Sequence, residues 1–310
     1  MRIALVTPAG PGTRNGNRHT ALRWAAFLRA AGHRVSISSE NVSAEADLML
    51  ALHARRSHAS IKAFPSAKPL AVALTGTDVY RDIRTSAEAR ESLELAHRLI
   101  VLQPKAAEEL PGRLRKKVAV VVQSSATSLR HRPVKGKFRI CVIGHLRAEK
   151  DPLRIVAALP YVAPMVDVVH LGAALDPKLK PATGDARYRW LGSVSHATAL
   201  RWLASSHAMV ISSRMEGGAN VVCEALRIGV PVLASRISGN VGLLGPGYPG
   251  YFRVEDERAL ARLITRAATH ADFYRSLKAH VRNLRPMVAP QAEARALLAA
   301  LNALPASAER

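Results

Sequence analysis

The sequence predicts an α/β protein with two doubly wound domains, each built on a parallel sheet with helices on both faces. Short apolar runs alternate with helix-length segments from the amino terminus onward, which is typical of parallel strands joined by crossover helices. A basic, proline-containing stretch, Leu129–Lys137, interrupts this alternation, and the pattern restarts at Arg139. The 310 residues are enough for two domains of ordinary size.

The first domain contains a predicted helix, Asn17–Ala31, that a loop connects to the first strand. Its predicted strands are the apolar runs Ile3–Thr7, Val35–Ser38, Leu48–His53, Leu70–Thr75, Leu99–Leu102 and Val118–Gln123. We assign residues 1–133 to this domain and interpret Leu129–Lys137 as the linker that ends it.

The second domain repeats the same alternation. Its predicted strands are Arg139–Gly144, Val166–Leu171, Arg189–Leu191, Ala208–Ile211 and Val230–Ala234, and Gly229 is expected to cap a helix before the last of them. Helical patterns follow at Glu257–His270, Ala271–Asn283 and Gln291–Leu301. We assign residues 134–285 to this domain and treat residues 286–310 as a carboxy-terminal helix that is free to pack back on the first domain.

The chain is strongly basic, with a formal net charge of +22. Such a charge is also found in nucleic-acid-binding proteins. The arginines are scattered through every segment, however, and aromatic residues make up only 5% of the chain, so the sequence offers no stacking platform or basic tail. We expect the charge to attract anionic small molecules and predict no obligatory nucleic acid partner. A non-catalytic binder of nucleotides or nucleic acid is one alternative.

No apolar run is long enough to span a membrane, and a strand begins at Ile3, which leaves no room for a secretory signal. We therefore expect a cytoplasmic protein without a membrane partner. Cys141 and Cys223 lie in a predicted strand and a predicted helix, without the spacing of metal ligands, and are expected to be packing residues. The sequence predicts no metal and no cofactor.

The most informative segment is the glycine loop that follows the strand Ala208–Ile211. It carries Glu216, Gly217, Gly218, Ala219 and Asn220, with Glu224 in the first turns of the next helix. In an open parallel sheet this loop lies at the carboxyl edge, where ligands bind. The glycines permit a sharp turn and close approach, and the helix start presents N–H groups and a positive dipole end. These features predict a phosphate site.

Two carboxylates flank this predicted phosphate. Glu224 is favoured by the helix dipole and can accept hydrogen bonds from the hydroxyls of a ribose. Glu216 precedes the helix and faces another part of the ligand. A phosphate between two hydroxyl-binding carboxylates indicates a nucleotide sugar. The alternative is that both glutamates lie near a helix start without contacting a ligand.

A cationic loop, Gly144–Pro152, follows the strand Arg139–Gly144. We place Arg147 and Lys150 on a diphosphate leaving group, whose charge grows as its bond breaks. Lys150 would otherwise be an exposed lysine in a first helical turn, which the helix dipole disfavours.

Three loops of the first domain are rich in groups that bind anions. The first, residues 7–20, brings Asn15, Gly16, Asn17, Arg18, His19 and Thr20 to a helix start. The other two follow apolar strands and carry His53, Arg55, Arg56, Thr77, Asp78 and Arg81. Because the carboxyl ends of parallel strands meet at one edge, these loops predict a second anion site. Inert, solvated loops are the alternative.

These segments together resemble the two-domain GT-B glycosyltransferases of the retaining family-4 type. The resemblance rests on Asn15–Thr20 with Gly32–Val35, on Gly144–Lys150 and on Glu216–Glu224. It implies two Rossmann-like domains that face each other across a cleft. It also implies a UDP-sugar site made of His145, Arg147, Lys150, Glu216, Gly217, Gly218, Ala219, Asn220 and Glu224. His145 departs from the pattern, because such transferases commonly have an arginine there and a neutral imidazole cannot hold a diphosphate as a guanidinium does.

A closer resemblance is to the selenosugar synthases of the selenoneine pathway. It rests on His53–Ser57, Leu74–Asp82, Gly144–Pro152, Ser213–Val222 and Tyr248–Phe252. It implies transfer from UDP-N-acetylglucosamine or UDP-glucose to selenophosphate, with formation of a carbon–selenium bond and release of UDP and phosphate. The residues expected to bind selenophosphate are Asn15, Gly16, Asn17, Arg18, Thr20, Arg55, Arg56, Thr77 and Arg81. His19, His53 and Asp78 are the candidates for handling the water that hydrolyses the Se–P bond.

An ordinary glycosyltransferase with a hydroxyl acceptor would share every nucleotide-sugar feature of this chain. A hydroxyl generally needs a base, whereas selenophosphate is already anionic and needs only cations that position it. The arginines of the first domain favour selenophosphate.

Overall fold

The computed structural model describes residues 1–13, 15–39, 45–181 and 184–305. The chain divides into two compact units, which we call unit 1 (Met1–Gln123 with Pro290–Arg310) and unit 2 (Ser124–Ala289). Residues 306–310 of the segment predicted as a carboxy-terminal helix lie outside the described residues. Over the described part of the chain, no helix combines the length and apolar character needed to cross a bilayer.

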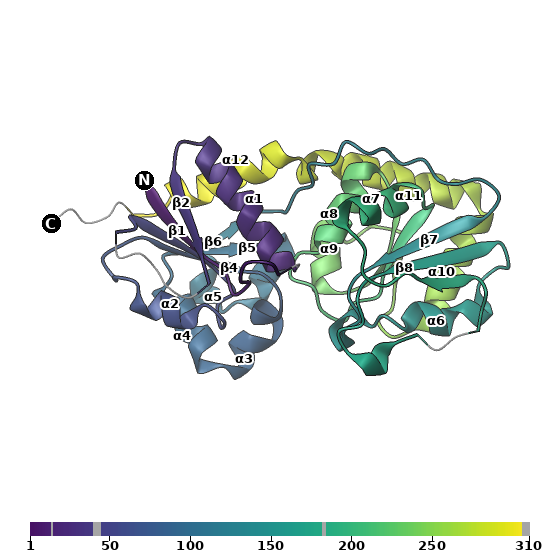
Figure 1. Ribbon diagram of the computed structural model, residues 1–310, viewed down its shortest axis with the longest axis horizontal. Coiled ribbons are helices and arrows are strands. Elements are labelled where there is room, and N and C mark those ends of the chain that lie inside the picture. The colour runs from purple at the N-terminus through teal and green to yellow at the C-terminus, as the bar shows by residue number, and fades with distance from the viewer. Residues whose placement is uncertain (14, 40–44, 182–183, 306–310) are drawn as a thin grey trace. The chain divides into compact units, whose positions relative to one another are not determined.

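Unit 1 is built on a six-stranded parallel sheet in the order β2-β1-β3-β4-β5-β6 (Figure 1). The strands are β1 (Arg2–Val6), β2 (Arg34–Ser38), β3 (Leu48–Leu52), β4 (Leu70–Leu74), β5 (Arg98–Val101) and β6 (Val118–Val120). The helices are α1 (Gly16–Ala30), α2 (His58–Ala63), α3 (Ile83–Thr85), α4 (Ala87–Leu95), α5 (Gly112–Arg115) and α12 (Pro290–Asn302).

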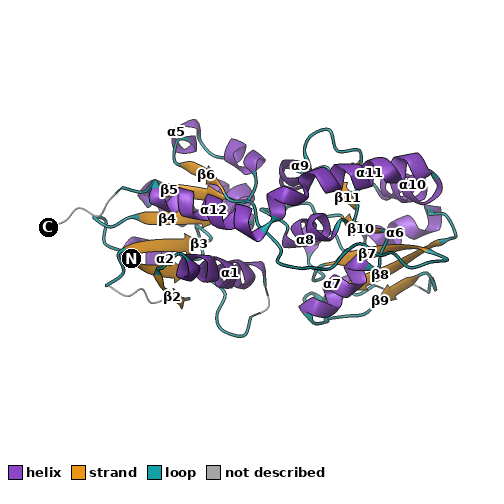
Figure 2. Cartoon of the chain, turned by 90° about the horizontal axis from the view of Figure 1, so that it is seen from above, coloured by secondary structure: helices purple, strands orange, loops and turns teal. Residues whose placement is uncertain are grey.

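Helices cover both faces of this sheet (Figure 2). On one face, Trp24 of α1 and Leu297 of α12 pack with apolar strand residues such as Leu5. On the other face, Ile61 of α2 and Leu93 of α4 pack with the strand residues that point the opposite way. A sheet buried on both faces needs almost continuously apolar strands, which is why the alternation was readable in the sequence.

Helix α12 belongs to unit 1 although it is remote in sequence. Glu293 of α12 is only 1% exposed, and its Oε1 accepts a hydrogen bond from Nε1 of Trp24 at 2.7 Å. Its Oε2 accepts one from Nε of Arg23, also at 2.7 Å. A buried carboxylate is tolerated when it is fully partnered, so these bonds fix α12 against α1.

Unit 2 is a second six-stranded parallel sheet, in the order β12-β11-β10-β7-β8-β9. The strands are β7 (Phe138–Ile143), β8 (Val166–Leu171), β9 (Tyr188–Trp190), β10 (Ala208–Ile211), β11 (Val232–Ser235) and β12 (Tyr251–Phe252). The helices are α6 (Arg154–Ala158), α7 (His196–Ala204), α8 (Asn220–Ile228), α9 (Ser238–Leu244), α10 (Glu257–Thr269) and α11 (Ala271–Leu284).

Each sheet reverses its strand order once, between β1 and β3 in unit 1 and between β7 and β10 in unit 2. Doubly wound sheets bind ligands at such reversal points, outside the carboxyl ends of the strands. The loops that follow these four strands are therefore the expected positions of the functional groups.

The segment interpreted as a linker is bonded to unit 2. Residues 124–137 contain neither helix nor strand. The N–H of Arg132 donates to the carbonyl of Ala204 at 2.8 Å, and the N–H of Val134 donates to that of Ser205 at 3.0 Å. Backbone hydrogen bonds, which leave no mark on the side-chain pattern, thus fix this segment to the end of α7.

Two histidines of unit 2, the buried His170 and the half-buried His131, predict a loss of stability in mild acid. Burial lowers the pKa of His131 and of His170 from 6.5 to about 4. Between these values the unfolded chain binds protons that the folded chain does not, so stability falls as the pH drops below 6.5. Each histidine contributes up to about 3 kcal/mol to this loss.

The free energy of unfolding in urea, measured at about pH 7.5 and about pH 5, gives the size of this loss, because the two conditions lie on either side of the ordinary pKa of histidine. The variant His131→Gln, whose amide can still donate to the carbonyl of Ser206, is expected to lose less stability between the two conditions. An equal loss in variant and wild type would contradict the assignment.

Candidate functional site

The candidate donor site in unit 2 is built on the loops that follow β7 and β10. The hydroxyl of Ser212 donates to the carbonyl of Asp151 at 2.8 Å. The N–H of Arg214 donates to the carbonyl of Glu149 at 2.9 Å. These bonds hold the two loops together at the reversal point of the sheet.

Lys150 and Glu216 meet where these loops touch. The ammonium group of Lys150 forms an ion pair with Oε1 of Glu216, and the hydroxyl of Ser213 donates to the same oxygen at 2.6 Å. Glu216 is buried, whereas the side chain of Lys150 is 33% exposed, so the pair is open to solvent on the lysine side. Lys150 ends a 3-10 turn, Ala148–Lys150, and the argument from the dipole of a longer helix does not apply to it.

Helix α9 begins directly against the backbone of Glu216. A Cβ atom placed on Gly239 would lie 2.0 Å from the carbonyl oxygen of Glu216 and 2.9 Å from its Cβ. Only glycine fits at this position. The segment after β11 therefore packs directly against the backbone of the loop that carries Glu216 and restricts its position.

The substitution Gly239→Ala is therefore expected to destabilise unit 2 by about 1–3 kcal/mol, because the backbone of Glu216 must move to admit a methyl group. The matched control is Gly247→Ala, where a Cβ would meet nothing within 4 Å. Thermal unfolding of the two variants measures the difference. Equal midpoints for Gly239→Ala and Gly247→Ala would contradict the close packing.

Helix α8 starts at Asn220, and its N-cap, Ala219, provides no side-chain cap. Uncapped helix starts of this kind bind phosphates. Neither Gly217 nor Gly218 has the left-handed backbone that occurs elsewhere among the described residues, so the turn itself does not require them. Close approach of a ligand to the backbone is what their missing side chains allow. Gly229 ends the helix with φ +99, and the predicted cap is confirmed.

Glu224 lies one turn into α8, which begins at Asn220, so the helix dipole favours it less than it would an acidic residue in the first turn. Its Oε1 lies 2.8 Å from Nε2 of His196, and this hydrogen bond raises the pKa of His196 above 6.5. His196 is the first residue of α7 and was not singled out from the sequence. Its position just after a strand, at the ligand-binding edge of the sheet, is the signal that could have identified it.

The other predicted residues of the β7 loop have different environments. Nδ1 of His145 accepts a hydrogen bond from the N–H of Ala173 at 3.1 Å, so this ring joins the β7 loop to the β8 loop. Arg147 is exposed, and its nearest acidic partner is Glu149 at 3.8 Å. Arg147 is thus the better placed of the two to contact a phosphate.

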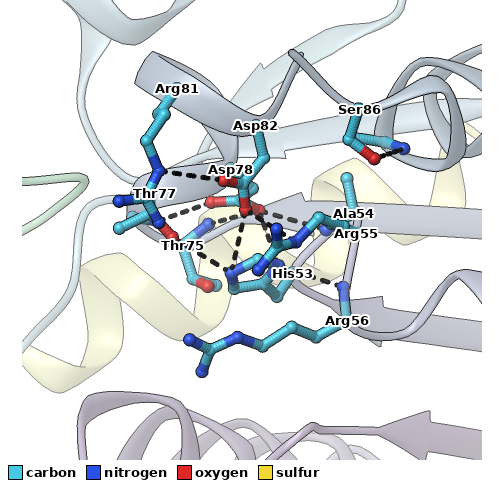
Figure 3. Close-up of polar contacts among 12 residues, drawn as sticks. His53, Ala54, Arg55, Arg56, Thr75, Thr77, Asp78, Arg81, Asp82 and Ser86 are labelled. Atoms are coloured by element: carbon cyan, nitrogen blue, oxygen red, sulfur yellow. Dashed lines mark hydrogen bonds and ion pairs between the residues drawn. The ribbon is translucent and has the colours of Figure 1, made fainter. Parts of the chain in front are cut away.

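The candidate acceptor site in unit 1 is organised by Asp78, which joins the loops after β3 and β4 (Figure 3). Asp78 is fully buried. Its carboxylate accepts hydrogen bonds from the N–H groups of Ala54 (3.1 Å), Thr75 (3.2 Å) and Gly76 (2.7 Å). A carboxylate with three backbone donors holds its loops in place, and we assign Asp78 a structural part in the site.

His53 is buried in the same cluster and has a left-handed backbone, with φ +74. Its Nδ1 accepts a hydrogen bond from the N–H of Arg56 at 3.3 Å, which leaves the proton of the neutral ring on Nε2. Nε2 lies 3.3 Å from Oγ1 of Thr77 and 3.8 Å from Oδ2 of Asp82. Burial lowers the pKa of His53, so the ring is neutral at physiological pH.

The sequence did not predict a role for Asp82, yet Asp82 contacts two of the predicted arginines. Nε of Arg55 lies 3.3 Å from Oδ2 of Asp82, and Nε of Arg81 lies 3.2 Å from Oδ1. The side chain of Arg56 extends away from Asp82 (Figure 3). The signal was present in the sequence as a second aspartate within the arginine-containing segment.

The start of α1 supplies the remaining predicted residues. Oδ1 of Asn15 caps the helix by accepting from the N–H of Arg18 at 3.0 Å. Thr20 is 1% exposed, and its hydroxyl accepts from Nε2 of Gln123 at 2.6 Å. These two polar groups therefore serve the helix and its packing. Gly16 and His19 are exposed, Asn17 and Arg18 are half-buried, and Arg14 of the same loop lies outside the described residues.

Residues 137–270 match the model of the family described as glycosyl transferases group 1. This span lies within unit 2 and contains both Lys150 and Glu216. None of the curated proteins matches the chain in sequence.

Solved structures of glycosyltransferases share the fold over nearly the whole chain. Sucrose-phosphate synthase from Thermosynechococcus elongatus is similar with a TM-score of 0.76 and 17% identity, over 96% of this chain and 99% of that chain. HepE from Anabaena, in complex with UDP and glucose, has a TM-score of 0.78 and 15% identity, over 98% and 100% of the two chains. The α/β fold of GT-B type expected from the resemblance is thereby confirmed.

Proposed function

We propose that this chain, a glycosyltransferase by its GT-B fold and by the family of its residues 137–270, is a selenosugar synthase. It transfers the glycosyl group of UDP-N-acetylglucosamine or UDP-glucose to selenophosphate. The products are a sugar with selenium on C1, UDP and phosphate. The observation that carries the proposal is the cluster of arginines around buried Asp82 in unit 1, which suits an acceptor that is itself an anion.

The donor binds to unit 2 in this proposal. Glu224 binds the ribose hydroxyls and Glu216 the hexose, while the uncapped start of α8 receives the phosphates together with Arg147 and Lys150. Lys150 exchanges its contact with Glu216 for the diphosphate, which frees the carboxylate for a sugar hydroxyl. HepE, which has the same fold, was solved with UDP-glucose bound, and this supports a UDP-sugar donor.

The acceptor binds to unit 1. Arg55, Arg56 and Arg81 hold the phosphoryl end of selenophosphate, with Arg18 and the first turn of α1 at the same sheet edge. The side chains of Arg55 and Arg81 are 41% and 57% exposed, so a ligand from solvent can reach them. Guanidinium groups bind such tetrahedral oxyanions in a bidentate manner.

The transfer itself requires no proton movement. A lone pair on selenium attacks C1 of the sugar, the C–Se bond forms, and the electron pair of the breaking C1–O bond leaves with UDP. The cations of unit 2 stabilise the charge that develops on the leaving diphosphate.

Hydrolysis of the Se–P bond completes the reaction. Water attacks phosphorus to give phosphate, and the electron pair of the Se–P bond stays on selenium as a selenolate. His53, neutral and buried, and His19, on the exposed first turn of α1, are the groups that we propose to orient this water. Asp78 contributes by holding the loop of His53.

Incubation of the purified protein with UDP-sugars, with and without selenophosphate, tests this function. UDP release is expected to depend on selenophosphate, and the product mass should include one selenium atom per sugar. UDP release that depends on a carbohydrate or lipid hydroxyl and ignores selenophosphate would identify an ordinary glycosyltransferase. Absence of turnover, with nucleic acid affinity that falls steeply with salt, would identify a binding protein.

A further inference from the structure

We propose that Asp82 is the positioning residue of a site in unit 1 for a tetrahedral phosphoryl dianion. Asp82 holds Arg55 and Arg81 by their Nε atoms and thereby presents their terminal nitrogens to the ligand. The inference rests on the proposed function only for the identity of that ligand. Nothing in the resemblance of the sequence to other enzymes assigns a part to Asp82.

The three side chains differ sharply in exposure. Asp82 is 1% exposed, whereas the arginine side chains are 41% exposed for Arg55 and 57% exposed for Arg81. Each guanidinium contacts the carboxylate through Nε, and neither has another ion pair within the described residues. The buried carboxylate thus contacts one nitrogen of each arginine and leaves the pair of terminal nitrogens of these partly exposed side chains for a ligand.

The hydrogen bonding of Asp82 supports this reading. Its Oδ2 is buried and has no hydrogen-bond partner among the described residues, although Nε of Arg55 lies 3.3 Å away and Nε2 of His53 lies 3.8 Å away. An unsatisfied buried carboxylate oxygen is costly and calls for a reason. Orientation of two guanidinium groups in a binding site provides one, because the contacts of Asp82 are directed at ligand-binding side chains.

The ligand class follows from the guanidinium geometry. The two terminal nitrogens of an arginine match two oxygens of a phosphoryl group, and Arg56 adds a third cation that extends away from Asp82 (Figure 3). Phosphate, thiophosphate and selenophosphate share this chemistry. Inorganic thiophosphate is therefore a suitable probe that is independent of turnover.

Calorimetric titration of inorganic thiophosphate into wild type and Asp82→Asn separates positioning from simple charge. If Asp82 acted only as a charge, its neutralisation would tighten binding, because a repulsive carboxylate would be removed. As a positioning residue, its loss is expected to weaken binding about tenfold or more, the size of one charge-assisted hydrogen bond. The control Glu109→Gln, which removes a partner of Arg84 elsewhere in unit 1, is expected to bind thiophosphate as wild type does.

A second variant, Arg81→Lys, tests the same claim without touching the buried carboxylate. It keeps the charge at an exposed position but lacks Nε and the pair of terminal nitrogens, so an equivalent loss of affinity is expected. Thermal unfolding identifies any variant that fails to fold. Unchanged or tighter thiophosphate binding in folded Asp82→Asn, or wild-type binding in Arg81→Lys, would overturn the proposal.

The outcomes for Asp82 and for the proposed function can be told apart. Weakened thiophosphate binding in Asp82→Asn, with no selenophosphate-dependent UDP release by wild type, would keep the anion site and refute the selenosugar synthase. If UDP release by wild type depends on selenophosphate but Asp82→Asn has an unchanged KM for selenophosphate, the proposed enzyme activity stands and the positioning role of Asp82 is refuted.

Discussion

Replacement of both Arg55 and Arg56 by alanine is expected to abolish selenophosphate-dependent UDP release while UDP affinity stays close to that of wild type. Arg55 contacts buried Asp82, and Arg56 extends away from it in the same cluster. The two guanidinium groups position the acceptor, so their loss is expected to lower kcat/KM at least about a hundredfold. The residues proposed to bind UDP all belong to unit 2, whereas Arg55 and Arg56 belong to unit 1.

Steady-state UDP release and calorimetric UDP binding measure the two quantities separately. The control Arg113→Ala removes an arginine of unit 1 that is 70% exposed and paired with Glu94, and it is expected to behave as wild type. Loss of UDP affinity in the double variant, with acceptor dependence retained, would show that the parts of the two units are reversed.

Neutralisation of Glu216 is expected to have the second large effect. Glu216→Gln keeps the shape of the side chain but loses the charge that Lys150 and Ser213 contact. Because Glu216 is proposed to bind the hexose in the transition state, kcat/KM is expected to fall about 10²–10³-fold. The UDP dissociation constant should change little.

The variant Lys150→Ala provides the comparison. The ammonium group of Lys150 is proposed to bind the diphosphate, so its removal should weaken UDP binding as well as transfer. The control Asp272→Asn removes a carboxylate that is 92% exposed on α11. Binding of UDP and initial rates of transfer measured on all three variants check the assignment. An equal loss of UDP affinity in Glu216→Gln and Lys150→Ala would place both groups on the diphosphate and contradict separate roles.

Much of the fold was predictable because its strands are buried on both faces and therefore read as apolar runs. The strands Val166–Leu171 and Ala208–Ile211 have the predicted bounds. Strand β12, Tyr251–Phe252, has only two residues and leaves no pattern that could be recognised. Strand β11 begins at Val232, later than predicted, since Pro231 before it has no N–H to donate to a sheet.

The site was predictable in its residue types but not in its pairs. The sequence directed attention to Lys150 and Glu216 as separate ligand contacts, and only the reversal of strand order at β7 and β10 brings them together. The contact of His196 with Glu224 likewise depends on how α7 and α8 pack. Pairs of charges that are distant in sequence have no local signature, because tertiary structure alone determines their separation.

The central claim is that UDP binds to unit 2 at the loop after β7 and the start of α8. A crystal structure of the protein soaked with UDP tests it most directly. We expect the phosphates beside residues 144–150 and 217–220, and the ribose within hydrogen-bond distance of Glu224. UDP bound to the arginines of unit 1, or at any position away from residues 216–224, would contradict the claim.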